Sequence, residues 1–283
     1  MNKLEILLDT PPWEWPRNAG EMFLKVLKDP RAGQSDRRIA VELAGNCTVI
    51  NDKLSEALLA IVRNAREPDE LRARAAISLG PVLELADTFE FDDPDDVPIA
   101  EKTFHKIQDA LHQVYLDSGV SKEVRRRVLE ASVRAPADWH RDAIRDAYAS
   151  GDREWMLTAV FGMRHVRGFD AEILESLKNA DREIHFEAVR AAGNWELDGA
   201  WSHVVGLVND PDTPKDLLLA AIEAVGSMRP AEAEVILADL IDSEDEEIAE
   251  AVDEAVSAND SVIDDEDEED DEDEEDEEDD WLN

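Results

Sequence analysis

The sequence predicts an all-α fold, an α-solenoid (superhelix) of about seven helix pairs followed by a disordered acidic C-terminal tail. Two observations predict it. Variants of one amphipathic helix recur along the chain at spacings near thirty residues, and small residues occupy the same place in most copies. A helix of this kind cannot bury its apolar face alone, and it does so by stacking on its neighbours.

The two clearest copies lie at residues 152–160 and 181–189, which both begin with Asp-Arg-Glu and reach Ala-Val at the same offset. Alignment of the seven copies places the following residues at one position: Gly45, Gly80, Ser132, Arg164, Gly193, Gly226 and Val256. Their successive spacings are 35, 52, 32, 29, 33 and 30 residues. Acid at the start of a copy predicts a helix N-cap, and the glycine or serine near its end predicts a C-terminal turn.

In chain order, residues 1–33 are expected to form an N-terminal capping segment that contains a helix over 19–28. The solenoid is expected over residues 34–258. Its one wide spacing indicates an insertion of about twenty residues, which includes an acidic, proline-broken loop near 88–98 and precedes a helix over 99–116.

Each repeat is expected to contain a second helix, because apolar residues recur at helical spacing between the first helices. The residues that show this period are Leu54, Leu58, Ile61 and Val62, then Ile173, Leu174 and Leu177, then Val204, Val205 and Val208, and last Ile236, Leu237, Leu240 and Ile241. The predicted unit is therefore helix, turn, helix and a short polar loop.

These alanine-rich helix pairs resemble HEAT repeats, and in particular the short bacterial type called phycobilin-lyase-like. The resemblance covers residues 34–258 and implies a scaffold that binds other proteins. The wider group also includes bilin lyases and deoxyhypusine hydroxylase, whose His-Glu pairs hold two irons. None of the six histidines here is followed by glutamate, so that di-iron site has no counterpart in this sequence.

No catalytic motif is present. The chain has no Gly-x-Ser-x-Gly, no glycine-rich phosphate loop and no pair of histidines at metal-ligand spacing on one helix. The single cysteine, Cys47, excludes an intramolecular disulfide and is expected to be buried. We therefore expect no enzyme activity, no cofactor and no metal site.

The formal net charge is −41. A run of seventeen acidic residues at positions 264–280 accounts for 17 of these charges and leaves −24 on the rest. Such a chain repels nucleic acids and anionic membranes, so the expected partner is a protein with a basic surface. The absence of a signal pattern and of a long apolar stretch predicts a cytoplasmic protein without membrane association.

Residues 259–283 are expected to be disordered, because the acidic run cannot form a core. The tail ends in Trp281 and Leu282. An acidic run with an apolar tip resembles the C-terminal tails of bacterial single-stranded-DNA-binding proteins, which recruit partner enzymes. Three roles stay open for the tail: a solubilising extension, a docking peptide, or an autoinhibitory segment that folds back on the solenoid.

The turns that follow the first helices contain candidate partner-binding residues: Arg134, Arg167, Trp195 and Arg229. Stacked repeats would place these residues along one edge as a basic and aromatic ridge, and arginine and tryptophan are enriched at binding hot spots. The alternative interpretation is structural, with each arginine bound to helix-end carbonyls or carboxylates and Trp195 filling a gap between repeats.

The leading functional prediction is a non-enzymatic protein–protein interaction scaffold, with the acidic tail modulating or extending binding. One alternative is a bilin-lyase-like or other ligand-handling enzyme of the HEAT-like group. The other is an acidic-tail chaperone or nucleic-acid mimic for basic proteins.

Overall fold

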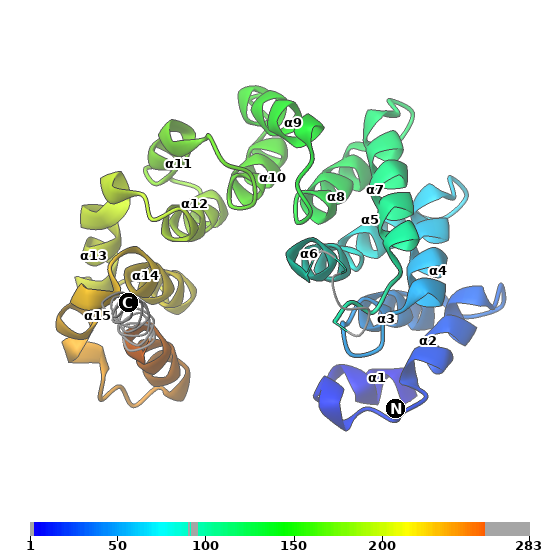
Figure 1. Cartoon of the computed structure of the whole chain (residues 1–283), viewed down its shortest axis with the longest axis horizontal. Coiled ribbons are helices and arrows are strands. Elements are labelled where there is room, and N and C mark those ends of the chain that lie inside the picture. Colours follow the sequence, from blue (N-terminus) through cyan, green and yellow to red (C-terminus); the bar gives the residue numbers. More distant parts are fainter. Residues whose placement is uncertain (1–2, 90, 92–95, 258–283) are drawn as a thin grey trace, which may run out of the picture. The chain divides into compact units, whose positions relative to one another are not determined.

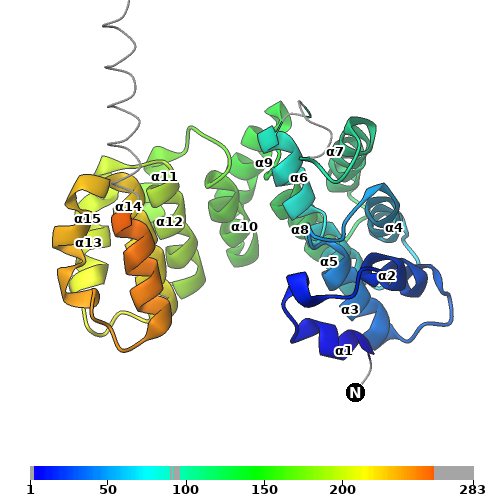
Figure 2. The same cartoon turned by 60° about the horizontal axis from the view of Figure 1, so that its bottom comes forward.

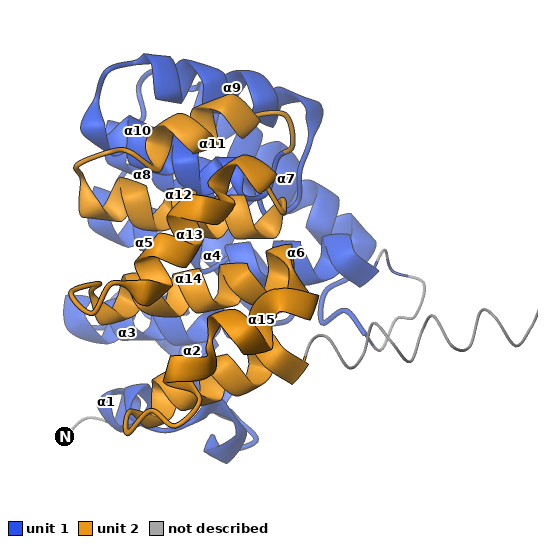
Figure 3. Cartoon of the chain, turned by 90° about the vertical axis from the view of Figure 1, so that its left-hand side faces the viewer, with its two compact units in different colours: residues 1–166 blue, residues 167–283 orange. Residues whose placement is uncertain are grey.

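The computed structural model describes residues 3–89, 91 and 96–257, and this part of the chain is helical, without a β-strand. The predicted all-α repeat architecture is confirmed. The chain divides into two compact units, residues 1–166 and 167–283 (Figure 3). No helix in the described ranges is both long enough and apolar enough to cross a membrane.

Unit 1 has two layers of helices (Figure 1). The first-helix layer contains α3 (Gln34–Ala44), α5 (Asp69–Ile77), α8 (Lys122–Ser132) and α10 (Arg153–Met163). The second-helix layer contains α2 (Ala19–Lys28), α4 (Asp52–Arg63), α7 (Glu101–Leu116) and α9 (Asp138–Ala149). Successive first helices pack against one another, and α4 packs against both α2 and α7.

The N-terminal segment adds a shortened helix pair to this stack. Helix α1 (Lys3–Leu8) packs against α3, a 3₁₀ turn η1 (Pro12–Glu14) follows, and α2 has the bounds that the sequence predicts. The Trp15 indole donates hydrogen bonds to the carbonyls of Leu7 and Thr10, and its ring meets Phe23 edge-on at 5.5 Å. The half-buried Trp15 side chain thereby attaches the segment to α2.

Unit 2 continues the same plan. Its first helices are α12 (Arg182–Asn194), α14 (Lys215–Met228) and a helix over residues 246–257. Its other elements are α11 (Asp170–Ser176), η2 (Asp198–Ala200), α13 (Trp201–Asn209), α15 (Pro230–Ile236) and η3 (Ala238–Leu240). The expectation of one helix through residues 236–241 is wrong, because α15 ends at Ile236 and a 3₁₀ turn follows.

Acidic residues cap and link the first helices, as their positions in the repeat predict. The carboxylates of Asp152 and Asp181 accept backbone N–H groups in the first turns of α10 and α12. Lys122 at the start of α8 pairs with Asp152 at 3.1 Å, and Lys215 at the start of α14 pairs with Asp245 at 2.7 Å. These pairs are largely exposed and therefore contribute little to stability.

The aligned glycines mark points where first helices approach closely. A Cβ on Gly45 would lie 2.3 Å from the Ser78 carbonyl oxygen, and one on Gly193 would lie 2.9 Å from the Cα of Ala224. Gly226 is similarly crowded. Gly45 is the C-cap of α3, as the predicted C-terminal turn requires. None of these three glycines has a positive φ, so the need for glycine at these positions is steric.

The insertion in unit 1 contains a helix that the sequence did not predict. Helix α6 (Gly80–Phe89) packs against α7 and α8 (Figure 2). Part of the expected acidic loop, residues 90 and 92–95, lies outside the described residues. The helix expected over 99–116 begins two residues later, at Glu101. Cys47 is exposed, so its expected burial is wrong.

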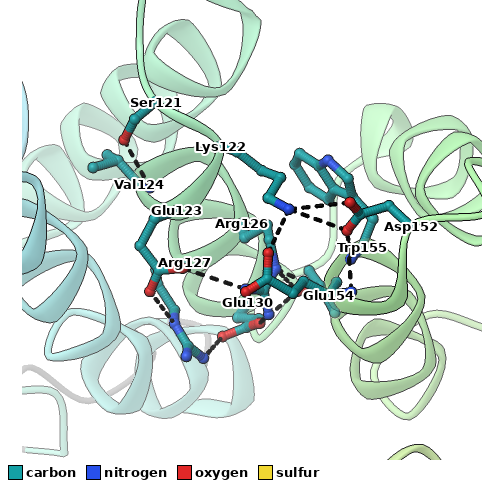
Figure 4. A network of polar contacts seen from close by, with 11 residues as sticks. Ser121, Lys122, Glu123, Val124, Arg126, Arg127, Glu130, Asp152, Glu154 and Trp155 are labelled. Carbon is teal, nitrogen blue, oxygen red and sulfur yellow. Dashed lines mark hydrogen bonds and ion pairs between the residues drawn. The ribbon is translucent and has the colours of Figure 1, made fainter.

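A buried ionic network joins α8 to α10 (Figure 4). The side chains of Arg126 and Glu130 are 3% and 7% exposed and lie 3.5 Å apart. Arg126 also donates to the backbone carbonyl of Glu154, and the Thr158 hydroxyl donates to Glu130 at 2.6 Å. Because an uncompensated buried charge is costly, these partners fix one alignment of the two helices.

Candidate partner-binding surfaces

The turn between α12 and α13 gathers several of the residues singled out in the sequence. The Arg167 guanidinium lies over the Trp195 ring at 4.5 Å. Arg229 lies over the ring of Trp201, at the other end of the same turn, at 4.6 Å. Within unit 2 the structure therefore brings Arg167, Trp195 and Arg229 to one turn, and the sequence did not predict Trp201 as a stacking partner.

Carboxylates accompany the arginines at these turns. Arg229 pairs with Asp198 at 3.2 Å and with Glu232 at 3.0 Å, and the hydrogen bond to Asp198, followed by that to Glu232, raises its pKa. Arg134, in unit 1, pairs with Glu84 and lies 5.6 Å from the Phe161 ring centre. Trp281 and Leu282 lie outside the described residues.

A second surface is a groove of about 620 Å³ on the first-helix layer of unit 2. It runs over α12, α14 and residues 246–257. Its apolar lining includes half-buried Phe186 and Leu219, with Ala220 and Ala255 buried beside them. The lining recurs in the repeat register, because Phe186 and Leu219 both stand seven residues before an aligned glycine.

The groove is strongly acidic. Its ionisable lining residues are Asp216, Glu223, Glu247, Glu250 and Glu254 against a single base, Arg190. Arg182 pairs with Asp216, and its hydrogen bond lowers the pKa of that carboxyl group. Lys215 pairs with Glu247 at 2.7 Å.

The other three groove carboxylates, on Glu223, Glu250 and Glu254, make no ion pair within the described part of the chain. Glu250 and Glu254 stand four residues apart on one helix, so they share a face, and Glu223 faces them from α14. Like charges held together without a counterion repel one another, and a bound cation would relieve that repulsion.

Unit 1 has a comparable groove of about 520 Å³ over α3, α5 and α8, and its charges are neutralised internally. Arg74 pairs with Glu42 at 2.5 Å, Arg38 pairs with Glu70 at 3.0 Å, and Arg127 pairs with Glu123 at 3.2 Å. Unpaired acid therefore distinguishes the unit 2 groove from its counterpart.

The sequence contains a signal for this groove, which lies in the first helices and not in the turns. Arg190 and Glu223 both stand three residues before an aligned glycine, and Phe186 and Leu219 stand seven before. Positions three and four apart share a helix face, so the repeat alignment alone predicts that these residues form a stripe. Whether their charges are paired depends on side chains of neighbouring helices, and only the structure shows which these are.

Among the residues that the structure describes, no group of three or more histidine, cysteine, aspartate or glutamate side chains is arranged to hold a metal ion. The groove and the turn between α12 and α13 present charge and apolar area, which are features of binding surfaces.

The fold and these surfaces define a helical-repeat protein. No protein-family model and no curated protein matches the chain. Among solved structures, an engineered protein is similar at 17% identity over 73% of this chain and 96% of its own, with a TM-score of 0.41.

Two further solved structures are similar to the chain. Human deoxyhypusine hydroxylase matches at 16% identity over 85% of this chain and 96% of its own, with a TM-score of 0.37. A designed armadillo repeat protein matches at 16% identity over 84% of this chain and 98% of its own, with a TM-score of 0.33. At these identities the similarity is one of fold alone.

Proposed function

We propose that this chain is a non-enzymatic interaction scaffold that binds a basic segment of a partner protein in the acidic groove of unit 2. The observation that carries the proposal is the set of three unpaired carboxylates, Glu223, Glu250 and Glu254, beside an apolar lining. The proposed HEAT-like identity of the repeats agrees with this role.

The physical basis is complementarity of charge and shape. A partner segment with arginine or lysine would neutralise the groove carboxylates, while its apolar side chains would cover Phe186 and Leu219. The net charge of −41 attracts basic proteins at long range and repels nucleic acid. Selection of a basic protein partner therefore begins before contact and is completed in the groove.

The ridge residues belong to the proposal as a second contact region. Arg167, Trp195 and Arg229 offer flat, stacked surfaces of the kind that dominates binding energy at interfaces. Arg134 would contribute separately from unit 1. Trp281 and Leu282 would act as a docking tip at the end of the acidic run, reaching a pocket on a partner.

The central test replaces Glu223, Glu250 and Glu254 by glutamine in the full chain. The probe is a short fluorescein-labelled amphipathic peptide of arginine and leucine, followed in fluorescence anisotropy. Because each exposed charge pair contributes about 0.2–1 kcal/mol, we expect the affinity to fall on the order of tenfold. The loss should shrink as salt is raised, since screening weakens exposed pairs.

The control is a variant with the same change in net charge outside the groove: Glu234→Gln, Asp239→Asn and Asp242→Asn, all exposed in unit 2. It should bind the probe as the unaltered chain does. Equal losses in both variants would contradict the groove and favour non-specific attraction by the acidic chain. Binding abolished only by removal of residues 264–283 would favour the acidic-tail chaperone or mimic instead.

The ligand-handling alternative has its own measurement. A bilin-lyase-like protein purified from its native source would carry visible absorbance from a bound tetrapyrrole, whereas a scaffold would be colourless. Affinity purification from that source with the groove variant as a matched bait would identify the protein partner. The proposed partner is one that the groove variant no longer retains.

A further inference from the structure

Two histidines of unit 2 meet tip to tip. His185 lies in the first turns of α12 and His203 lies in α13, and their Nε2 atoms are 2.7 Å apart. The ring centres are 4.9 Å apart, and the ring planes cross at 63°. Both rings are half-buried.

The environment of this pair favours the neutral form of both rings. Burial lowers the pKa of both imidazoles, and the neighbouring His203 charge lowers the pKa of His185 further. In the neutral pair one Nε2–H donates to the other Nε2. A neutral imidazole is the form that binds metal ions.

We propose that His185 and His203 form a binding site for a divalent transition-metal ion, with the two Nε2 atoms as adjacent ligands and water in the remaining positions. Binding requires the donating Nε2 to lose its proton to solvent and its Nδ1 to take one up. The ring stays neutral, so no net proton is released by this exchange.

The separation of the two nitrogens can be compared with the separations that different metal geometries require. With metal–nitrogen bonds of about 2.0–2.1 Å, a 90° angle at the metal requires the Nε2 atoms to stand about 2.9 Å apart, and a tetrahedral angle requires about 3.3–3.4 Å. The observed 2.7 Å is therefore about 0.2 Å short of the tetragonal geometry that Cu²⁺ and Ni²⁺ prefer. It is about 0.6 Å short of the tetrahedral geometry usual for zinc.

Copper(II) is accordingly the expected ion, because both the nitrogen separation and the general order of divalent affinities favour it. With two protein ligands the ion would be exchangeable, and it would join α12 to α13 within one repeat. The site is separate from the groove residues that carry the proposed function, so either proposal stands or falls without the other.

The test is a titration of the full chain with copper(II) sulfate, in excess magnesium to occupy the many carboxylates, followed by electron paramagnetic resonance and calorimetry. We expect one site per chain, with couplings from two imidazole nitrogens. His185→Gln and His203→Gln should each remove one nitrogen and weaken binding about tenfold or more, equivalent to a loss of about 1.4 kcal/mol or more. Glutamine keeps a hydrogen-bonding partner for the remaining histidine.

The matched control is His105→Gln, which alters a histidine that is 62% exposed in unit 1 and should change neither the spectrum nor the affinity. Unchanged nitrogen couplings in both site variants would overturn the proposal, as would copper bound through carboxylate oxygens alone or zinc bound more tightly than copper. If a variant loses its helical circular dichroism, the test uses the unaltered chain alone. Its electron paramagnetic resonance spectrum with copper(II) must then show couplings from two imidazole nitrogens, and a spectrum without them would overturn the proposal.

Discussion

At the scale of single residues, buried polar groups are the most informative part of this chain. His140 is 2% exposed. Its Nδ1 accepts the Ala137 backbone N–H at 2.8 Å, and its Nε2 lies 3.0 Å from the Ser132 hydroxyl. Since the Ser132 hydroxyl donates to the Leu129 carbonyl, the Nε2–H of His140 donates to Ser132, which fixes the neutral tautomer.

This arrangement predicts a dependence of stability on pH. Burial lowers the pKa of His140 from 6.5 to about 4. As pH falls from about 6.5 to about 4, the unfolded chain takes up a proton that the folded chain cannot, so stability is lost. The shift corresponds to about 3 kcal/mol of unfolding free energy.

Urea unfolding of the chain and of His140→Gln, compared at pH 7 and pH 4.5, measures this contribution. The difference in unfolding free energy between the two proteins should narrow or reverse at the lower pH. Carboxylates also lose ion pairs in acid, but their contribution is the same in both proteins and cancels in the difference. A difference that does not vary with pH would show that His140 is protonated while folded.

Residue types at the candidate surfaces follow from the sequence, but their pairing does not. The repeat alignment indicates that Arg167, Trp195 and Arg229 belong to corresponding turns. It cannot show that Arg229 pairs with Asp198 while Glu223 and Glu250 are left without a cation. Ion pairs depend on distances of a few ångströms between helices, which no periodicity encodes.

At the scale of elements, glycine positions determine how closely the first helices approach. Gly193 in α12 faces Ala224 of α14, where an added Cβ would lie 2.8 Å from the Ala224 Cβ. Gly206 lies in α13, and an added Cβ there would meet nothing within 4 Å. The same residue type is therefore required by packing at one site and unconstrained by it at the other.

We expect opposite effects from the same substitution at these two glycines. Gly193→Ala should destabilise the fold by about 1–3 kcal/mol, because overpacking forces α12 and α14 apart. Gly206→Ala should stabilise it by about 0.5–1 kcal/mol, because alanine has the higher helix propensity. Denaturant unfolding of the two variants measures both; a stabilised Gly193→Ala would contradict the steric role of the repeat glycine.

Helix α6 is the element that the sequence did not predict. The sequence marks an insertion by its spacing of 52 residues, and Gly80 reads as the end of a helix. In the structure Gly80 begins α6, whose buried residues Val82, Leu83 and Ala86 lie on one face. That face is helical in period but short, and only its packing on α7 and α8 gives the segment a place in the fold.

At the scale of the whole molecule, charge is the dominant property. The net charge of −41 includes the 17 acids of residues 264–280, and residues 281–283 add none. Attraction of a basic ligand at long range depends on the summed charge, whereas retention depends on groove contacts. The tail and the groove should therefore affect different rate constants.

A chain truncated after residue 263 carries a net charge of −24. We expect its association rate with the arginine–leucine peptide to fall by about tenfold at low salt, with the dissociation rate unchanged. Stopped-flow fluorescence at several salt concentrations measures both rates. Trp281→Ala with Leu282→Ala in the full chain keeps all the charge, so it should leave these rates unchanged while losing any partner that docks on the tip.

An unchanged association rate would show that the tail does not steer ligands. If truncation instead increased affinity for an acidic peptide, the tail would be a competitor for the arginines of the turns.

The sequence by itself determined the helical-repeat architecture, the phase of the first helices, the capping aspartates and the acidity of the chain. These properties follow from composition and from periodicity within single helices, so no contact between helices is needed to predict them. The tertiary structure decided which glycines are crowded, which carboxylates lack a cation, and that His185 meets His203. Those properties depend on contacts between residues about eighteen to thirty-three positions apart, whose distances are set only when the helices stack.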